Sequence, residues 1–347
     1  MSSLSSIKEI FLIDINNNLN SNPNSRNNSI QRKSIFSINE KYTLKEIYLA
    51  MLYATLSSLF YAFNTIIIKL TSIWSKYYTA YNFLWWRGVT STIFLYFYMR
   101  KYNPELSLFD LKIIKRKTWF VIRVLGFYIG FVFFSSSLLL IRVSTVQVLA
   151  NLAPVFALVI SVFLNGEKFY IRYLVGILLC FLGSFIILGS EKGNTKDKNF
   201  DLFKLILGSV CALINAIISG FTNVSQKILG DSGMTNKQQV FYISVVLIIM
   251  SFIFCVFTNN FGMDIAIFLM GTLNGVNFFF ANHFYQEALP VLNVGGCVPF
   301  NYLLVIFVFI LCVIVLGENI YFTDIIGSLV IISFHAYNAW VPIQNNE

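Results

Sequence analysis

Charged residues are scarce in this sequence. Asp, Glu, Lys and Arg together make up 12% of the 347 residues, whereas hydrophobic residues make up 57% and aromatic residues 17%. A water-soluble globule of this length could not bury so much apolar surface, because most of its exterior must stay polar. The composition therefore excludes a soluble protein and predicts that a lipid bilayer covers much of the chain.

The sequence signatures of metal sites, ATP hydrolysis and common hydrolytic enzymes are also missing. The five cysteines lie within apolar runs, with no CxxC pair and no histidine at metal-ligand spacing. No GxxxxGK[ST] is present to bind ATP phosphates, and there is no HExxH, no GxSxG and no pair of aspartates within the apolar runs. We therefore expect no metal, no cofactor and no enzymatic activity.

Residues 1–45 lack sustained hydrophobicity and are rich in Asn and Ser. Ordering such a segment costs more conformational entropy than its burial returns, so we expect a disordered tail. The short apolar stretch around Phe11 is followed by Asn, Ser and single charges instead of a small-residue cleavage site, which argues against a secretory signal peptide.

Beyond this tail, apolar runs follow one another closely. Each is near the roughly 20 residues that an α-helix needs to cross about 30 Å of hydrocarbon. They predict ten membrane-spanning helices at about 47–70, 79–99, 119–141, 145–164, 171–190, 202–228, 240–258, 263–285, 292–316 and 322–341. The connections are too short to form a separate domain. The predicted fold class is thus an all-α polytopic membrane protein.

Basic residues are distributed unequally between the two sets of loops. If the N-terminus is cytoplasmic, most Lys and Arg residues fall on the cytoplasmic side, as they do in membrane proteins generally. We therefore predict that both termini, including the short tail 342–347, are cytoplasmic. Topology also explains the net charge of +9, so nucleic acid is not an expected partner.

The two halves of the chain share landmarks. Gly166-Glu167 and Gly317-Glu318 each follow a long apolar run and each lie ten residues before another glycine. Lys69 and Lys227 end the first and sixth predicted helices at matching positions. These landmarks predict two five-helix repeats, 46–190 and 201–341. Because five is an odd number, the repeats enter the membrane from opposite sides, an arrangement that permits alternating access around a central site.

At these positions the chain resembles EamA-type members of the drug/metabolite transporter superfamily. The matching residues are Lys69, Arg87-Gly88, Pro154-Val155-Phe156, Gly166-Glu167, Gly176 and Gly183. The resemblance covers about residues 47–341 and implies a ten-helix transporter; its second half is a looser match, with Ser328 and Ser333 where more glycine is expected. Relatives that carry phosphorylated substrates usually place Lys or Arg in the late helices. Residues 292–340 contain neither, which counts against a phosphorylated substrate.

Polar side chains within the apolar runs are costly in hydrocarbon and usually face the interior, where they can line a path. The candidates for substrate binding are Asn64, Arg87, Gln147, Asn151, Asn274, Asn277, His283, Asn301 and Tyr302. Arg87 could bind an anionic substrate, neutralise a buried acid, or snorkel to the membrane interface beside Trp85 and Trp86. Pro154 follows Asn151 and either opens a pocket or kinks a packed helix.

Four residues at helix ends are candidates for gating: Lys69, Glu167, Lys227 and Glu318. Their simpler interpretation is as helix caps, interface anchors or loop salt bridges. His283 and Glu287, at i and i+4, could carry a coupling proton but fit a structural pair better.

The leading functional hypothesis is a secondary transporter of a small organic solute. The alternative is a non-transporting membrane scaffold or regulator with the same fold. The expected partners are a small-molecule substrate and the lipid bilayer, and a homodimer stays open as an assembly. The sequence names neither the substrate, the coupling ion nor the membrane.

Overall fold

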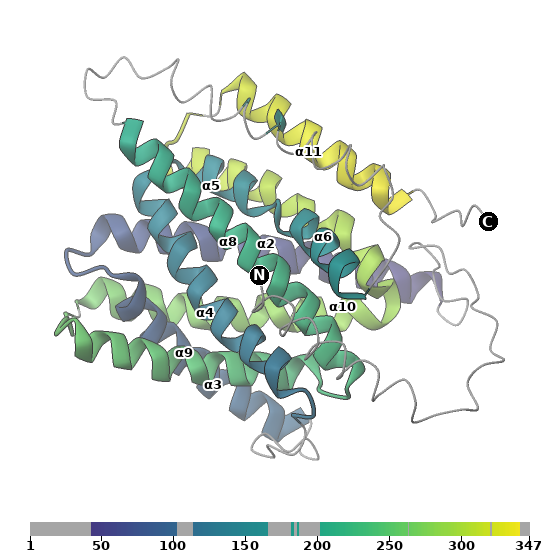
Figure 1. Ribbon diagram of the computed structural model, residues 1–347, viewed down its shortest axis with the longest axis horizontal. Helices are drawn as coiled ribbons and strands as arrows, with labels where there is room; N and C mark the ends of the chain where they lie inside the picture. The colour runs from purple at the N-terminus through teal and green to yellow at the C-terminus, as the bar shows by residue number, and fades with distance from the viewer. Residues whose placement is uncertain are drawn as a thin grey trace, which may run out of the picture.

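The computed structural model describes residues 43–102, 114–165, 182–183, 186, 202–262, 264–319 and 321–340. Within these ranges every regular element is a helix, and the helices pack into one bundle (Figure 1). The predicted all-α class is therefore confirmed. The predicted N-terminal tail up to residue 42, the C-terminal tail and almost all of the fifth predicted span lie outside the described residues.

The first half of the chain contributes α2 (Leu44–Trp74), α3 (Ala80–Tyr102), α4 (Lys117–Leu140), α5 (Val143–Ala150) and α6 (Ala153–Asn165). The second half contributes α8 (Leu202–Asp231), α9 (Asn236–Phe257), α10 (Ile265–Leu311), the π-helical segment η3 (Cys312–Leu316) and α11 (Phe322–Trp340).

Side-chain caps fix where several of these helices begin. Thr43 and Glu46 form a reciprocal capping box at the start of α2, and Thr235 and Gln238 form another at the start of α9. The Asp264 carboxylate accepts a hydrogen bond from the backbone N–H of Ile267 at 2.9 Å and caps α10. Such caps satisfy backbone N–H groups that have no partner within the helix.

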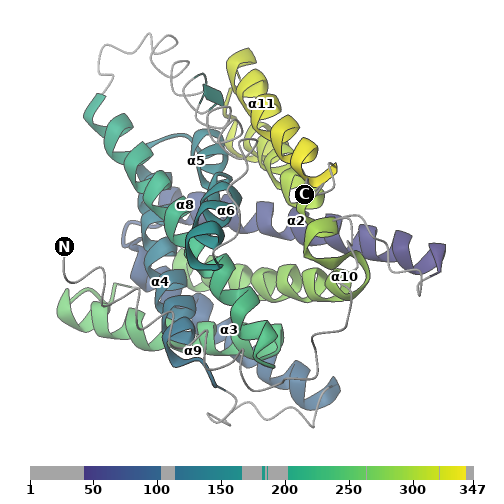
Figure 2. The ribbon, with the colours of Figure 1, turned by 45° about the vertical axis from the view of Figure 1, so that its right-hand side comes forward.

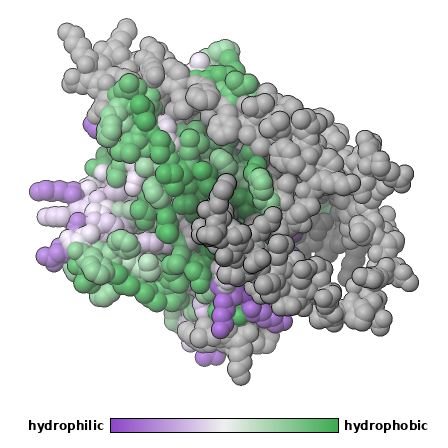
Figure 3. All heavy atoms as spheres, in the orientation of Figure 1, coloured by the Kyte–Doolittle hydropathy of each residue, from purple (hydrophilic) through white to green (hydrophobic). Residues whose placement is uncertain are grey.

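The surface of the bundle fits a bilayer. Six helices in the described part of the chain are long and apolar enough to cross a membrane. Large hydrophobic side chains point outward, and Phe257 is 83% exposed and Phe163 80%. Figure 3 shows hydrophobic residues over the left and middle of one face, with hydrophilic residues gathered at its left edge and at the bottom. Water would disfavour so much exposed apolar surface, so the chain is a multi-pass membrane protein.

Helix α10 reverses direction along its length. Ser57 and Ser58 are neighbours on α2, yet Ser57 Oγ donates to the Ala281 carbonyl at 2.8 Å and Ser58 Oγ to the Phe300 carbonyl at 2.6 Å. In a straight helix those two carbonyls would lie roughly 28 Å apart. The spans predicted at 263–285 and 292–316 are therefore the two arms of a hairpin, although helical backbone continues through the bend.

The span predicted at 145–164 is interrupted. Helix α5 ends at Ala150 and α6 begins at Ala153, directly ahead of Pro154. Proline has no N–H to donate to the carbonyl four residues earlier, and its ring crowds that carbonyl. The structure therefore shows a break in the helix ahead of Pro154, where the sequence left a pocket or a kink as the two alternatives.

Contacts near one end of the bundle fix the relative direction of the two halves. Lys69 Nζ, near the end of α2, donates to the carbonyl of Leu138 near the end of α4 at 2.5 Å. Ser137 Oγ donates to the carbonyl of Gly208, near the start of α8, at 2.9 Å. Helix α8 thus begins at the end of the bundle where α2 and α4 finish, and it runs opposite to α2.

Small residues let α4 and α8 approach closely. A Cβ atom on Gly126 would lie 2.8 Å from Cγ2 of Thr222, and one on Gly130 would lie 3.3 Å from Oδ1 of Asn215. This face of α4 therefore packs closely on α8, and Figure 2 shows the two helices side by side.

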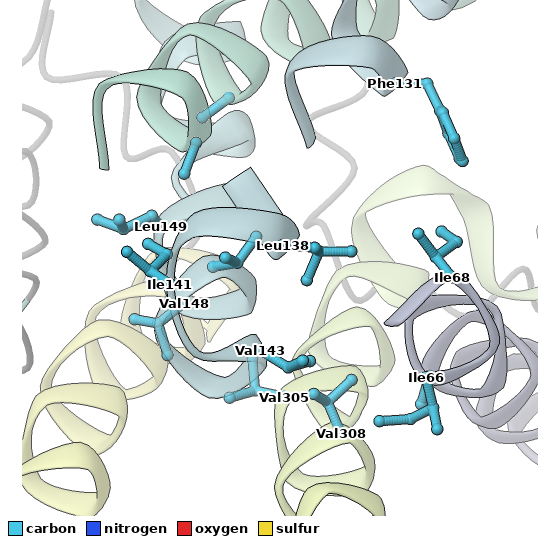
Figure 4. Packing of buried hydrophobic residues seen from close by; sticks show 14 of the residues in the cluster. Ile66, Ile68, Phe131, Leu138, Ile141, Val143, Val148, Leu149, Val305 and Val308 are labelled. Carbon is cyan, nitrogen blue, oxygen red and sulfur yellow. The ribbon is translucent and has the colours of Figure 1, made fainter. Parts of the chain in front are cut away.

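The main hydrophobic cluster joins the two halves. Ile66 and Ile68 of α2, Val143 of α5 and Val305 and Val308 of α10 are all buried in it (Figure 4). Because the cluster contains residues from both halves, side-chain packing holds the repeats together in addition to the covalent connection between them.

We expect Gly220→Ala to destabilise the bundle. A Cβ at this position on α8 would lie 2.9 Å from the backbone nitrogen of Ala157 and 2.9 Å from Cβ of Phe156, so α6 must shift. Overpacking of this kind costs about 1–3 kcal/mol, which outweighs the gain of about 1 kcal/mol in helix propensity. Thermal unfolding of the purified protein in detergent measures the effect.

Gly230→Ala on the same helix is the matched control, since no atom lies within 4 Å of a Cβ there. It should melt at or slightly above the temperature of the parent protein. If Gly220→Ala melts as high as Gly230→Ala, the close approach of α6 and α8 is not a constraint on the fold.

Candidate functional site

Arg87 lies two turns into α3, with its guanidinium turned into the bundle. The residue is 3% exposed. The guanidinium carbon lies 4.2 Å from the ring centroid of Phe278, 4.5 Å from that of Phe131 and 5.9 Å from that of Phe127. The ring faces attract the cation, but Nε and Nη1 are buried without a hydrogen-bond partner. This burial excludes the snorkelling alternative.

Arg123 faces the same region from α4, one helical turn before Phe127 and on the same side of the helix. It is 7% exposed; Nη1 donates to the carbonyl of Thr222 on α8 at 3.1 Å, and Nε has no hydrogen-bond partner. Tyr61 of α2 lies within electrostatic range of both Arg87 and Arg123. Both guanidinium groups are thus buried in the interior near α2, Arg87 on α3 and Arg123 on α4.

Asn64, Asn274 and Asn277 lie where α2 meets α10. Asn274 Nδ2 donates to the backbone carbonyl of Asn64 at 3.1 Å, and Asn277 Nδ2 donates to that of Phe60 at 2.6 Å. These two bonds hold the helices together. Both polar atoms of the Asn64 side chain and Oδ1 of Asn274 are buried without a partner. A polar ligand or water can satisfy such groups.

Gln147 and Asn151 lie beside the break between α5 and α6. Gln147 Oε1 accepts a hydrogen bond from Thr65 Oγ1 at 3.3 Å, and Nε2 donates to Asn151 Oδ1 at 3.5 Å. Asn151 Nδ2 is buried without a partner. Thr65 directly follows Asn64, so Gln147 and Asn274 both contact the same turn of α2. The structure thus brings together Asn64, Gln147, Asn151 and Asn274.

His283 lies toward the end of the bundle where α3 finishes. Its Nδ1 is 3.8 Å from Oε1 of Glu287, and its ring stacks on Phe279 with centroids 6.0 Å apart. Its ring also lies 5.0 Å from that of Tyr98, near the end of α3. His283 lies five residues beyond Phe278, the one phenylalanine of α10 among the three around Arg87. The predicted i, i+4 pair is present, and it borders the arginine region without entering it.

An ionic cluster joins the halves at the opposite end of the bundle. The Arg142 guanidinium donates to both carboxylate oxygens of Asp324, at 3.2 and 3.4 Å, and to the carbonyl of Asn319 at 3.2 Å. Glu318 Oε1 accepts from the backbone N–H of Val143 at 3.3 Å. Lys69 interacts electrostatically with Glu318. The sequence pointed to Lys69 and Glu318, but not to the pair Arg142 and Asp324.

The remaining predicted residues are not part of these groups. Lys227 matches Lys69 in sequence but is exposed on α8, so the two lysines have different surroundings. Glu167 lies outside the described residues, as do the side chains of Asn301 and Tyr302. In the described part of the chain no group of three His, Cys, Asp or Glu residues lies close enough to hold a metal ion.

Sequence reasoning missed Arg123 and Tyr61 as members of the site. Arg123 lies near the start of the predicted span 119–141, and its spacing of seven residues from Gly130 puts it on the packing face of α4. Tyr61 is one of 18 tyrosines, and nothing in its sequence neighbourhood distinguishes it. Its hydroxyl donates to Asn282 Oδ1 at 3.1 Å, which only the fold reveals.

A separate apolar groove of about 470 Å³ lies between the second arm of α10, η3 and α11. Ser328 is the one polar residue in its lining, and its hydroxyl donates to the carbonyl of Asp324. The groove is open at the surface of the bundle, which suits a lipid chain better than a polar solute.

Comparisons with known proteins agree with this architecture. The family model described as the EamA-like transporter family matches residues 48–189 and again residues 206–335. One solved chain, described only as the crystal structure of a protein, is 14% identical, covers 87% of this chain and 99% of its own length, and superposes with a TM-score of 0.58. At that identity the likeness shows the fold alone. No curated protein matches significantly.

The two matched segments correspond to the two repeats that the Gly-Glu and Lys landmarks predict, and together they include most of the chain. The polar interior between α2, α3, α4 and α10 lies within them. The chain belongs to the EamA-like transporter family of membrane proteins.

Proposed function

We propose that this protein is a secondary carrier that moves a small organic solute across a membrane by alternating access between two inverted five-helix repeats, 46–190 and 201–341. In this proposal both termini face the cytoplasm. The observation that carries it is the set of buried polar groups without partners at the junction of the halves: Asn64, Arg87, Asn151 and Asn274.

The pattern of helix contacts supports the repeat. Helix α2 packs on α10, α4 packs on α8, and α3 packs on α9. If α2 is matched with α8 and α4 with the first arm of α10, exchanging the halves converts the first contact into the second. Helices α3 and α9 exchange with one another. Together with the opposite directions of α2 and α8, this pattern is typical of repeats related by an axis in the membrane plane.

The cost of unsatisfied polar groups supports a solute pathway. Within hydrocarbon each unpaired polar group costs several kcal/mol, and a charged one costs more. A rigid scaffold would gain stability if these side chains were apolar. A carrier needs them, because they must bind a solute that comes and goes.

The ionic cluster at the far end supports a closed gate. Arg142 precedes α5 in the first half, whereas Glu318 and Asp324 belong to the second half. Asp324 is fully buried, and its contact with Arg142 joins the two halves at that end. We infer that separation of these residues opens the site to that side of the membrane.

We expect Asn64→Ala to lower solute flux by about tenfold, because loss of one buried hydrogen-bonding group costs about 1–1.5 kcal/mol of binding free energy. The measurement is uptake from a metabolite mixture into liposomes that contain the purified protein, read by mass spectrometry. Asn223→Ala is the matched control, since Asn223 is exposed on α8, and it should leave flux unchanged.

Protein-free liposomes set the background of this assay. If the parent protein moves no solute above that background, the carrier proposal fails and the scaffold alternative takes its place. Equal flux in Asn64→Ala and Asn223→Ala would remove Asn64 from the pathway.

We expect Asp324→Asn to loosen the gate. The substitution removes the charge that binds Arg142, so residues 143–150 of α5 should exchange their amide hydrogens faster in hydrogen–deuterium exchange. Asp231→Asn is the matched control, because Asp231 is exposed at the end of α8, at the other end of the bundle. Unchanged exchange in α5 of Asp324→Asn would show that the ionic cluster does not hold this end closed.

A further inference from the structure

Two buried cations in the bundle bear on the charge of the solute. Arg87 and Arg123 are both buried in the bundle, and neither forms an ion pair within the described residues. The ion pairs that the described residues do form join other residues: Arg142 with Asp324, and His283 with Glu287.

The sequence offers no carboxylate that could reach these guanidinium groups from the neighbouring helices. Helices α3, α4, α5, α6 and α9 contain no Asp or Glu. Helix α2 has only Glu46 in its first turn, and α8 has only Asp231 as its last residue. Glu287 of α10 lies nine residues beyond Phe278, or about 13 Å along the helix. Within the described residues, the charges of Arg87 and Arg123 are therefore not neutralised by a carboxylate.

Aromatic rings offset only part of the cost of burying Arg87. The rings of Phe131 and Phe278 lie within 4.5 Å of the guanidinium carbon. Each such contact stabilises a cation less than a full ion pair with good hydrogen bonds does. Nε and Nη1 of Arg87 stay without acceptors, and so does Nε of Arg123. An anion with two or more acceptor oxygens would accept hydrogen bonds from these nitrogen atoms.

An oxyanion fits the donors that are present. The planar guanidinium group donates two parallel N–H bonds to a carboxylate or phosphate group. The unpartnered amide of Asn64 adds a neutral donor and acceptor from α2. Arg123, one turn below Phe127, offers a second positive charge about 6 Å further along α4.

We propose that the transported solute is a small organic oxyanion, bound by the Arg87 guanidinium with the Arg123 guanidinium as a second positive charge. This inference rests on the proposed carrier function and deepens it. It departs from phosphate carriers whose cations lie in the late helices, since here both cations come from α3 and α4.

Uptake from charge-separated metabolites tests this proposal. A cell extract is divided by ion exchange into anionic, cationic and neutral fractions, and each fraction is offered to liposomes that contain the full-length protein. We expect accumulation from the anionic fraction alone. Phosphatase treatment of that fraction distinguishes the two sources of an oxyanion: carboxylates survive it, whereas phosphate esters do not.

Substitutions connect the uptake to the arginines. Arg87→Gln should lower anion uptake by at least about tenfold, because the charge and the paired donors are both lost. Arg87→Lys keeps the charge without the planar fork, so KM should rise while the maximal rate is largely kept. This variant keeps the test valid if Arg87→Gln does not fold. Arg100→Gln is the matched control, because Arg100 is exposed near the end of α3.

The outcomes separate the two proposals. Accumulation from the cationic or neutral fraction overturns the oxyanion assignment and leaves the carrier function standing. Accumulation from none of the three fractions overturns the carrier function itself, and the assignment falls with it. Anion uptake that is the same in Arg87→Gln, Arg87→Lys and the parent protein overturns the role of Arg87.

Discussion

The burial of Arg87 is the constraint around which the bundle is arranged. A guanidinium in a membrane-spanning bundle needs partners from several helices at once, and here the rings come from α4 in the first half and α10 in the second. For this, α3 must lie close to α10, and Gly275 permits it: a Cβ there would lie 2.9 Å from the carbonyl oxygen of Arg87. The burial of this one charged side chain thus constrains the distances between α3, α4 and α10.

Two kinds of contact join the halves, and they differ in strength and place. Along α2 the bonds run from side chain to backbone, as from Ser57 to Ala281 and from Asn277 to Phe60, and they fix one helix against another. At the far end the link between Arg142 and Asp324 is ionic. Hydrogen bonds to the backbone suit helix pairs that move as a unit, whereas an ionic contact at a loop can break and re-form. This division is compatible with the alternating access that we propose.

Much of the fold could be predicted because hydropathy and proline act locally. The runs of apolar residues gave α2, α4, α8 and α9 nearly to their ends, and the break ahead of Pro154 follows from the chemistry of proline alone. The continuous helical backbone through the bend of α10 could not be foreseen, because polar residues near Glu287 suggest a loop there.

The site was less accessible to sequence reasoning. Arg87, Asn64, Gln147 and Asn151 stand out as polar residues within apolar runs. Other site residues have partners more than 50 residues away in the sequence. Arg123 binds the Thr222 carbonyl, and Tyr61 binds Asn282. Arg142 and Asp324 pair across the two halves. Such partners depend on how the helices pack, and a single sequence carries no direct signal for that packing.

Counterflow is the most direct test of a carrier that exchanges inward- and outward-facing shapes around Arg87. Liposomes containing the protein are loaded with an unlabelled anionic solute and diluted into a trace of the same solute in labelled form. A carrier predicts transient accumulation of the label inside, driven by exit of the unlabelled solute, and loss of this overshoot in Arg87→Gln. Simple equilibration of the label, without an overshoot in the parent protein, would contradict alternating access.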